Sequence, residues 1–166
     1  MNKADIPFLS ATRLGELIQD RYVSPVEVTE SYLDRVDALD SSLHSYITVC
    51  REEVTQAARQ AEHSLMRGES RGLLHGVPLA IKDQFLTKGI LTTAGSTILA
   101  DFVPDEDATV VARLKLTGAL LLGKLNMTQF AERSIFHPYD TPRNPWDLNR
   151  DPGTSSSGSG AATAAY

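Results

Sequence analysis

The chain has 166 residues, of which 42% are hydrophobic and 22% charged, and its formal net charge at pH 7 is -5. These values suit one globular domain and argue against direct binding of nucleic acid, because no block of lysine and arginine is present. The single cysteine, Cys50, excludes an internal disulfide, and no apolar run is long enough to cross a bilayer. Together these features favour a cytoplasmic protein without a membrane segment.

The first part of the chain is expected to form three helices. Ser10 can cap a first helix, and Ser24-Pro25-Val26-Glu27 predicts a second, with proline in its first turn and a capping box. The third helix is predicted from Arg51 to Arg67, and Gly68 is expected to end it. None of these helices carries a pattern that indicates chemistry.

The second part of the chain, from about Val77, is predicted to form a strand, a helix and a second strand. Val77-Pro-Leu-Ala-Ile81 and Ala119-Leu-Leu-Leu-Gly123 are short apolar runs, typical of strands buried on both faces. Asp107 can cap a helix between them. This order predicts an α/β fold. Residues Lys124 to Phe130 follow the second strand, where α/β folds commonly place ligand-binding residues.

Lys82 is the first candidate for chemistry, because it directly follows five apolar residues. A lysine that acts as a base near neutral pH must lower its pKa by about 3 units, or roughly 4 kcal/mol, and desolvation can supply this change. Asp83 would oppose the change if it paired with Lys82. Neighbouring side chains of a strand, however, point to opposite faces. The competing interpretation is a lysine that reaches solvent at a strand end.

Ser155, Ser156 and Ser157 stand in a glycine-rich loop that leads into an alanine-rich run from Ala161, where a helix is expected to begin. Glycine lets the backbone approach a ligand closely, whereas such a loop buries little apolar area. The alternative is a flexible linker. Residues 134–152, rich in Pro, Asp, Asn and Arg, are expected to form a long ordered loop before it.

Phosphate and metal sites are both poorly supported. The serine loop lacks the Lys-Ser/Thr of a P-loop and the third glycine of a dinucleotide fingerprint. His44, His63, His75 and His137 are scattered without ligand spacing, so we expect neither a metal nor another cofactor. His75 is expected where the chain turns into the first strand.

Six motifs occur in an informative order. They are Gly76-Val-Pro-Leu-Ala-Ile-Lys-Asp83, Thr92-Thr-Ala-Gly-Ser96, Asp107-Ala-Thr-Val-Val111, Gly123-Lys-Leu-Asn-Met127, Arg143-Asn-Pro-Trp-Asp147 and Pro152-Gly-Thr-Ser-Ser-Ser-Gly-Ser-Gly160. In order and separation the chain resembles the amidase signature family. The resemblance implies the N-terminal part of one α/β domain with a mixed central sheet flanked by helices, helical over 1–70 and α/β over 71–166.

The resemblance also implies a site. The family hydrolyses amides with a Ser–cis-Ser–Lys triad, in which Lys82 would be the lysine and Ser155 the bridging cis-serine. Ser156 would support Ser155. The stretch Met127 to Ala131 would form one wall of the acyl pocket, which makes Ala131 a supporting, substrate-binding position.

Two departures from the family pattern stand out. Thr154 replaces the second glycine before the serine pair, and a β-branched residue there is unfavourable for a cis peptide. The nucleophilic serine belongs to a second Gly-Gly-Ser segment, which does not occur in these 166 residues. We therefore expect the 166-residue chain by itself to be inactive, and stable only with the remainder of its sheet or as a homo-oligomer.

Three functions follow as hypotheses. The first is an amidase that acts on a small carboxamide. The second is the glutamine-hydrolysing A subunit of a tRNA-dependent amidotransferase, although residues Ala131 to Thr141 lack the Ser/Thr-Glu-Asn-Ser pattern expected of such subunits. The third is a truncated, non-catalytic fragment or interaction module that keeps the fold without the nucleophile.

Overall fold

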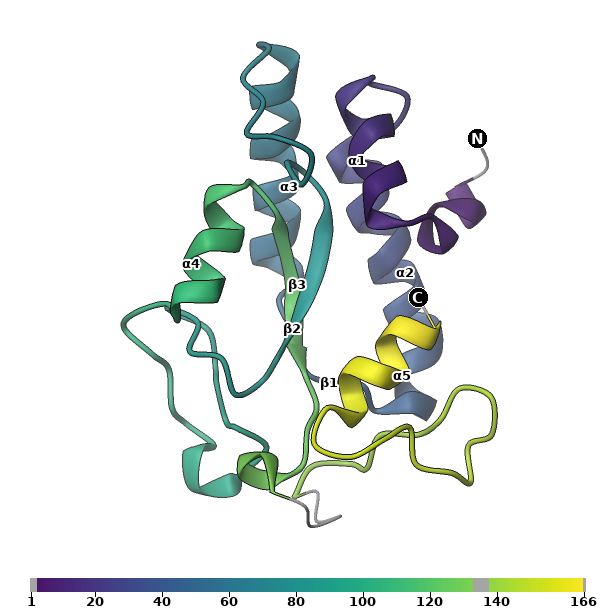
Figure 1. The fold of residues 1–166 in the computed structure, drawn as a ribbon, viewed down its shortest axis with the longest axis vertical. Coiled ribbons are helices and arrows are strands. Elements are labelled where there is room, and N and C mark those ends of the chain that lie inside the picture. Colours follow the sequence, from purple (N-terminus) through teal and green to yellow (C-terminus); the bar gives the residue numbers. More distant parts are fainter. Residues whose placement is uncertain (1–2, 133–137, 166) are drawn as a thin grey trace.

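The computed structural model describes residues 3–132 and 138–165. Its elements in chain order are η1 (Lys3–Phe8), α1 (Ala11–Gln19), α2 (Pro25–Leu43), β1 (Tyr46–Val49), α3 (Arg51–Met66), β2 (Pro78–Lys82), η2 (Thr97–Leu99), α4 (Thr109–Leu116), β3 (Leu120–Leu125), η3 (Gln129–Ala131) and α5 (Ser157–Ala165). Figure 1 shows the two long helices α2 and α3 side by side behind the strands. The expectations for His137 and for residues 134–137 lie outside the described residues.

The three predicted N-terminal helices are confirmed, with their caps. The Ser10 hydroxyl accepts a hydrogen bond from the Arg13 amide at the start of α1. At the start of α2 the capping box is complete, because Ser24 and Glu27 each accept from the other's backbone N–H. No described helix is long and apolar enough to span a membrane.

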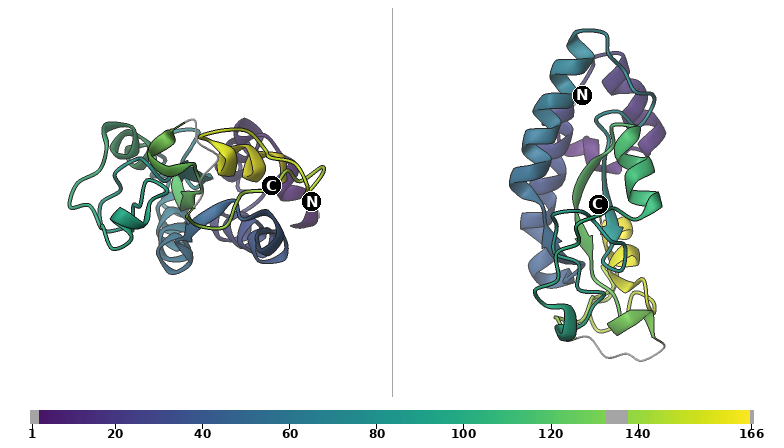
Figure 2. Two further views of the ribbon diagram at one scale, coloured as in Figure 1. Left: turned by 90° about the horizontal axis from the view of Figure 1, so that it is seen from below. Right: turned by 90° about the vertical axis from the view of Figure 1, so that its left-hand side faces the viewer.

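The strands form a mixed three-stranded sheet in the order β1-β3-β2. β2 runs parallel to β3, which fits the predicted α/β fold, and β1 pairs with β3 antiparallel. α2 and α3 pack on one side of the strands, whereas α4 and α5 lie on the other (Figure 2). Apolar side chains from α2, α3 and β3 fill the core between them: Leu33, Val54, Ala58, Ala61, Leu120 and Leu122.

The register of β2 against β3 contains one irregularity that matters for the site. Leu79 pairs with Leu121, but Ala80 pairs with Gly123, so Leu122 is an extra residue on β3. Beyond this bulge Ile81 pairs with Lys124 and Lys82 with Leu125. Paired residues in a sheet share a face and neighbours alternate, so Lys82 and Lys124 project from opposite faces.

Four details differ from the sequence expectations. β2 is only half-buried except at Ile81, because it lies at an edge of the sheet. The short strand β1 was not predicted, since four residues between two strong helix patterns give little signal. α4 has Ala108 at its N-cap, because the Asp107 carboxylate instead accepts from the Lys88 amide and the Lys115 ammonium. α5 begins at Ser157, before the alanine run.

Candidate active site

Lys82, the last residue of β2, meets the serine loop. Its Nζ lies 3.0 Å from the Oγ of Ser155 and 3.0 Å from the Oγ of Ser156, although more than 70 residues separate them in the sequence. Three of the four predicted site residues are thus in one cluster. Lys82 and Ser155 are half-buried, and Ser156 is exposed.

The surroundings of Lys82 favour its neutral form. Burial lowers the pKa of Lys82 below its ordinary value, and no charged neighbour among the described residues opposes this effect. A neutral amine has two N–H donors and one lone pair. Lys82 can therefore donate to one serine hydroxyl and accept the proton of the other, as a base must.

The serine loop is held in place by the packing of α5 on β3. The Gly158 amide donates to the carbonyl of Asn126, which follows β3 directly. A Cβ atom on Gly158 would lie 2.5 Å from the carbonyl oxygens of Asn126 and Ser45, so only glycine allows this approach. The close contact sets the start of α5, and with it Ser155 and Ser156, against the end of β2.

The cis geometry expected at Ser155 is not present. All peptide bonds of the described residues are trans, including the bond between Thr154 and Ser155. A trans bond is the lower-energy form for any residue other than proline, and Thr154 stands where the family pattern has glycine. Lys82 reaches both hydroxyls with this trans backbone.

Ala131 lies apart from the cluster. It is exposed at the end of η3, where Phe130 and Ala131 have φ of 50° and 60°, in the left-handed region. Ala94 links this segment to the strand of Lys82, since its N–H donates to the Asp83 carbonyl and its own carbonyl accepts from Phe130. No hydrogen bond between described residues joins Ala131 to Lys82 or to the serines, so its role as part of a substrate wall stays a prediction.

Sequence reasoning missed a buried ion pair beside Lys82. Lys124 and Asp83 are each fully buried, and the Lys124 Nζ lies 3.4 Å from the Asp83 Oδ1. Lys124 was expected after the second strand, but β3 continues through Leu125 and carries Lys124 inside the sheet. A lysine between a run of leucines and Leu125 was the available signal, because a lysine is rarely fully buried without a partner.

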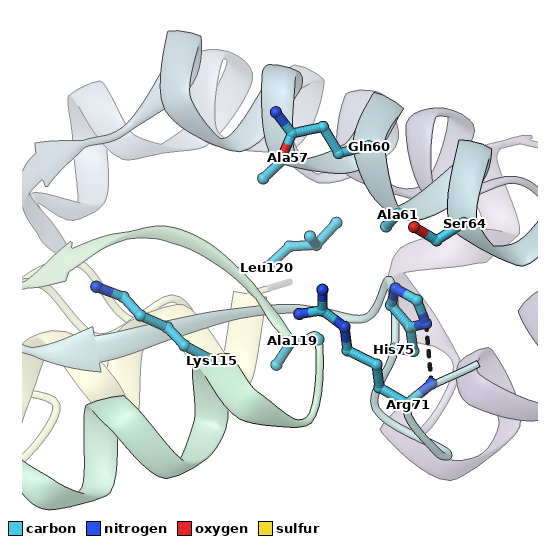
Figure 3. Close-up of a pocket in the computed structure, with 10 residues that line it drawn as sticks. Ala57, Gln60, Ala61, Ser64, Arg71, His75, Lys115, Ala119 and Leu120 are labelled. Atoms are coloured by element: carbon cyan, nitrogen blue, oxygen red, sulfur yellow. Dashed lines mark hydrogen bonds between the residues drawn. The ribbon is translucent and has the colours of Figure 1, made fainter. Parts of the chain in front are cut away.

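A separate cleft of about 170 Å³ lies near the opposite end of the strands, beside the start of β3. Figure 3 shows the side chains of Arg71, His75 and Gln60 around it. None of the lining residues belongs to the Lys82 cluster. The buried His75 accepts a hydrogen bond from the Arg71 amide just before β2, as its predicted place required.

The chain matches known proteins along most of its length. The Amidase family model matches residues 27–166. The A subunit of glutamyl-tRNA(Gln) amidotransferase from Moorella thermoacetica is 45% identical over 166 residues, covering 97% of this chain and 34% of that protein. The putative amidase AmiD of Mycobacterium bovis is 47% identical over 157 residues, which cover 95% of this chain and 33% of that protein. The chain thus spans about a third of the length of these relatives.

Solved structures of similar proteins share the fold of this chain. A bacterial aryl acylamidase of the amidase signature enzymes is 30% identical, with a TM-score of 0.84 over 92% of this chain and 32% of that chain. The arrangement of helices around a small mixed sheet is therefore shared with known amidase signature enzymes. The chain belongs to the amidase signature family.

Proposed function

We propose that this chain supplies the lysine and the bridging serine of a site that hydrolyses carboxamides. The observation that carries the proposal is the 3.0 Å contact between the Lys82 Nζ and the Ser155 Oγ, at a lysine whose pKa is lowered by burial. Membership of the amidase signature family supports the same chemistry. We further propose that the protein acts in the cytoplasm.

The proposed reaction uses Lys82 as the base. A nucleophilic serine passes its proton to the Ser155 Oγ as Ser155 passes its own proton to the Lys82 Nζ, and the serine attacks the amide carbon. The relay then runs backwards, protonates the leaving amine and leaves an acyl-enzyme that water hydrolyses. By family resemblance, the nucleophile belongs to a Gly-Gly-Ser segment outside these 166 residues.

Glutamine is the first substrate to test. Several of the similar relatives, among them the 45% identical protein from Moorella thermoacetica, are A subunits of glutamyl-tRNA(Gln) amidotransferase, and this favours the same role here. In this role the site would hydrolyse the glutamine side-chain amide, and other subunits of the amidotransferase would be its partners. The missing Ser/Thr-Glu-Asn-Ser pattern between Ala131 and Thr141 is a local difference that weighs less than identity along the whole chain.

An independent amidase for small carboxamides is the second candidate. The 47% identity to the putative amidase AmiD favours it, together with the same local difference. The two candidates differ in their partners. An A subunit would copurify with further subunits from its host and turn over glutamine, whereas an independent amidase would purify without them or as a homo-oligomer and prefer other amides.

The test is capture of an activated serine by a fluorophosphonate, followed by intact-mass measurement of the protein purified from its host. We expect one adduct in the wild type. Lys82→Arg, which cannot give up its proton, and Ser155→Ala should each slow labelling and amide hydrolysis by about 10²- to 10⁴-fold. The control Lys88→Arg alters an exposed lysine and should label at the wild-type rate.

The mass also identifies the species that reacts. An adduct on a protein much heavier than 18.1 kDa would place the nucleophile outside the 166 residues. Labelling that persists at the wild-type rate in both Lys82→Arg and Ser155→Ala would contradict the proposal, because the relay would then not activate the serine.

A further inference from the structure

The ion pair between Asp83 and Lys124 has no part in the relay described above, yet Asp83 is the sequence neighbour of Lys82. Both side chains of the pair have 0% exposure. Burial of two charges is unfavourable unless each is compensated, so a pair at this position calls for an explanation. The contacts around it suit an ammonium paired with a carboxylate.

The surroundings of Lys124 suit an ammonium, because a carboxylate and two further oxygen acceptors lie around its Nζ. Its Nζ lies 2.6 Å from the Thr92 Oγ1 and 3.0 Å from the Phe85 carbonyl oxygen. The Thr92 hydroxyl uses its own proton to donate to the Ile90 carbonyl, so it accepts from Lys124. The Asp83 Oδ1, 3.4 Å away, is the third polar neighbour and forms an ion pair with Lys124 without a hydrogen bond.

Asp83 is a carboxylate. Its Oδ2 accepts from the Thr93 amide at 2.8 Å and from the Thr93 hydroxyl at 2.6 Å. Its Oδ1 accepts no hydrogen bond from the described residues and faces the Lys124 ammonium. Through Thr93 and Ala94, Asp83 anchors the loop that in turn holds Phe130.

The sheet places this negative charge directly behind the proposed base. Lys82 pairs with Leu125 and Ile81 with Lys124, so Asp83 and Lys124 project from the face opposite to Lys82. Charges in a protein interior interact beyond direct contact. Without compensation, the Asp83 carboxylate would favour the ammonium form of Lys82, which cannot accept a proton.

We propose that Lys124 is a charge-compensating residue for the Lys82 base: it cancels the charge of Asp83, so that Asp83 can anchor the loop without holding Lys82 as an ammonium. This inference rests on the proposed function in one respect: the charge of Lys82 matters for catalysis only if Lys82 is the base. The electrostatic relation itself concerns Lys82, Asp83 and Lys124, and it can be measured without turnover.

Among the described residues, one other titratable group faces the pair, the Cys50 thiol. Burial raises its pKa to about 11, so Cys50 stays neutral except near the upper end of the pH range used below. Burial also lowers the pKa of Lys124, and the adjacent Asp83 opposes that effect. For Lys82, burial is the one influence on its pKa that the described residues provide.

The experiment measures the titration of Lys82 by competitive acetylation with acetic anhydride, from about pH 6 to about pH 11, a range that extends to either side of an ordinary lysine pKa. Mass spectrometry of the Lys82 peptide gives the midpoint. In Lys124→Met, the uncompensated Asp83 should raise this midpoint by about one pH unit. In Asp83→Asn the Lys82 midpoint should remain at the wild-type value or fall. In the double variant with Lys124→Met and Asp83→Asn it should return to the wild-type value.

The directions in which the Lys82 midpoint shifts distinguish this proposal from a purely structural role of the ion pair. If the pair only packs the site, either substitution loosens it, admits water to Lys82 and raises the midpoint in both variants. A matched control is Lys88→Met, which removes one positive charge at an exposed position where solvent screens it. No shift is expected there.

A second variant at position 124 is available if Lys124→Met does not fold. Lys124→Gln keeps N–H donors for Thr92 and Phe85 and replaces Lys124→Met if that variant does not fold. If neither folds, Asp83→Asn decides: an upward shift of the midpoint overturns the proposal, and any other result supports it. An unchanged midpoint in a folded Lys124 variant also overturns it.

The outcome is independent of the labelling test for the proposed function. Wild-type rates of fluorophosphonate labelling in both Lys82→Arg and Ser155→Ala would contradict the relay mechanism but would leave the acetylation midpoints of Lys82 unaffected. If the Lys82 midpoint rises in Lys124→Met and falls in Asp83→Asn, and labelling is lost in Lys82→Arg, the results support both the compensating role of Lys124 and the relay mechanism.

Discussion

Lys82 and Lys124 project from opposite faces of the same strand pair, and their surroundings give them different chemical roles. Lys82 faces two hydroxyl groups, and burial lowers its pKa. Lys124 faces a carboxylate and two further acceptors, and the adjacent Asp83 opposes the lowering of its pKa by burial. The same side chain can therefore serve as a base in one place and as a fixed charge in the other.

His75 should make the stability of the protein depend on pH. Burial, with a smaller effect of the Arg71 charge, lowers the pKa of His75 below 6.5, so the folded state holds the neutral ring. The unfolded chain takes up a proton first as the pH falls, and stability present above pH 6.5 is lost between 6.5 and the lower folded pKa. Urea unfolding at about pH 7 and about pH 5 should show this decrease.

The matched variants are His75→Asn and His63→Asn. An asparagine at position 75 keeps an acceptor for the Arg71 amide without the titrating ring, so the free energy of unfolding should vary less with pH. His63 is exposed on α3, and its replacement should leave the pH dependence of the wild type intact. Equal pH dependence in wild type and His75→Asn would contradict the assignment.

At the scale of elements, the site depends on how closely α5 approaches β3. Gly158→Ala should push α5 away, because its Cβ would lie 2.5 Å from two backbone oxygens that cannot move aside. We expect a loss of about 1–3 kcal/mol in the free energy of unfolding and a loss of amide hydrolysis, since Ser155 moves with the helix. Urea denaturation and an amidase assay check the two effects.

Thr163→Ala is the control on the exposed face of the same helix. It should leave both quantities near the wild-type values, because alanine is a good helix former and no packing is lost. If Gly158→Ala behaves like Thr163→Ala, the close packing of α5 does not position the serines.

Elements with strong local patterns were predictable from the sequence, whereas those that depend on long-range pairing were not. Capping boxes and apolar spacing identify α1, α2 and α3 because these signals lie within a few residues of each other. β1 exists through its pairing with β3, which no local pattern encodes. Lys82 was found from its place after an apolar run, whereas the role of Lys124 follows from a bulge that shifts the register of β2 and β3.

At the scale of the whole molecule, the described sheet ends at β2 with an unpaired edge. Beside it, apolar side chains line a crevice between the sheet and α4: Leu79, Ile81, Val111, Leu114 and Leu121. Such an edge beside apolar surface is unfavourable in water and invites pairing with another strand.

The 166-residue chain expressed by itself should therefore associate. We expect size-exclusion chromatography to show oligomers and denaturant melts followed by circular dichroism to lack a cooperative monomeric transition. Leu79→Glu should reduce association by placing a charge at the edge, whereas the same charge at an exposed position of α3, in Gln56→Glu, should not. A monomer that unfolds cooperatively would refute this expectation.

The bulge at Leu122 decides which side chain of each strand lies on which face. If the register of Leu79 and Leu121 continued without it, Lys82 would pair with Lys124, and the two lysines would share a face while Asp83 lay on the other. The extra residue thus keeps the two lysines apart. A slip of one residue between these strands, with every side chain kept, would place two lysines side by side and separate Asp83 from Lys124.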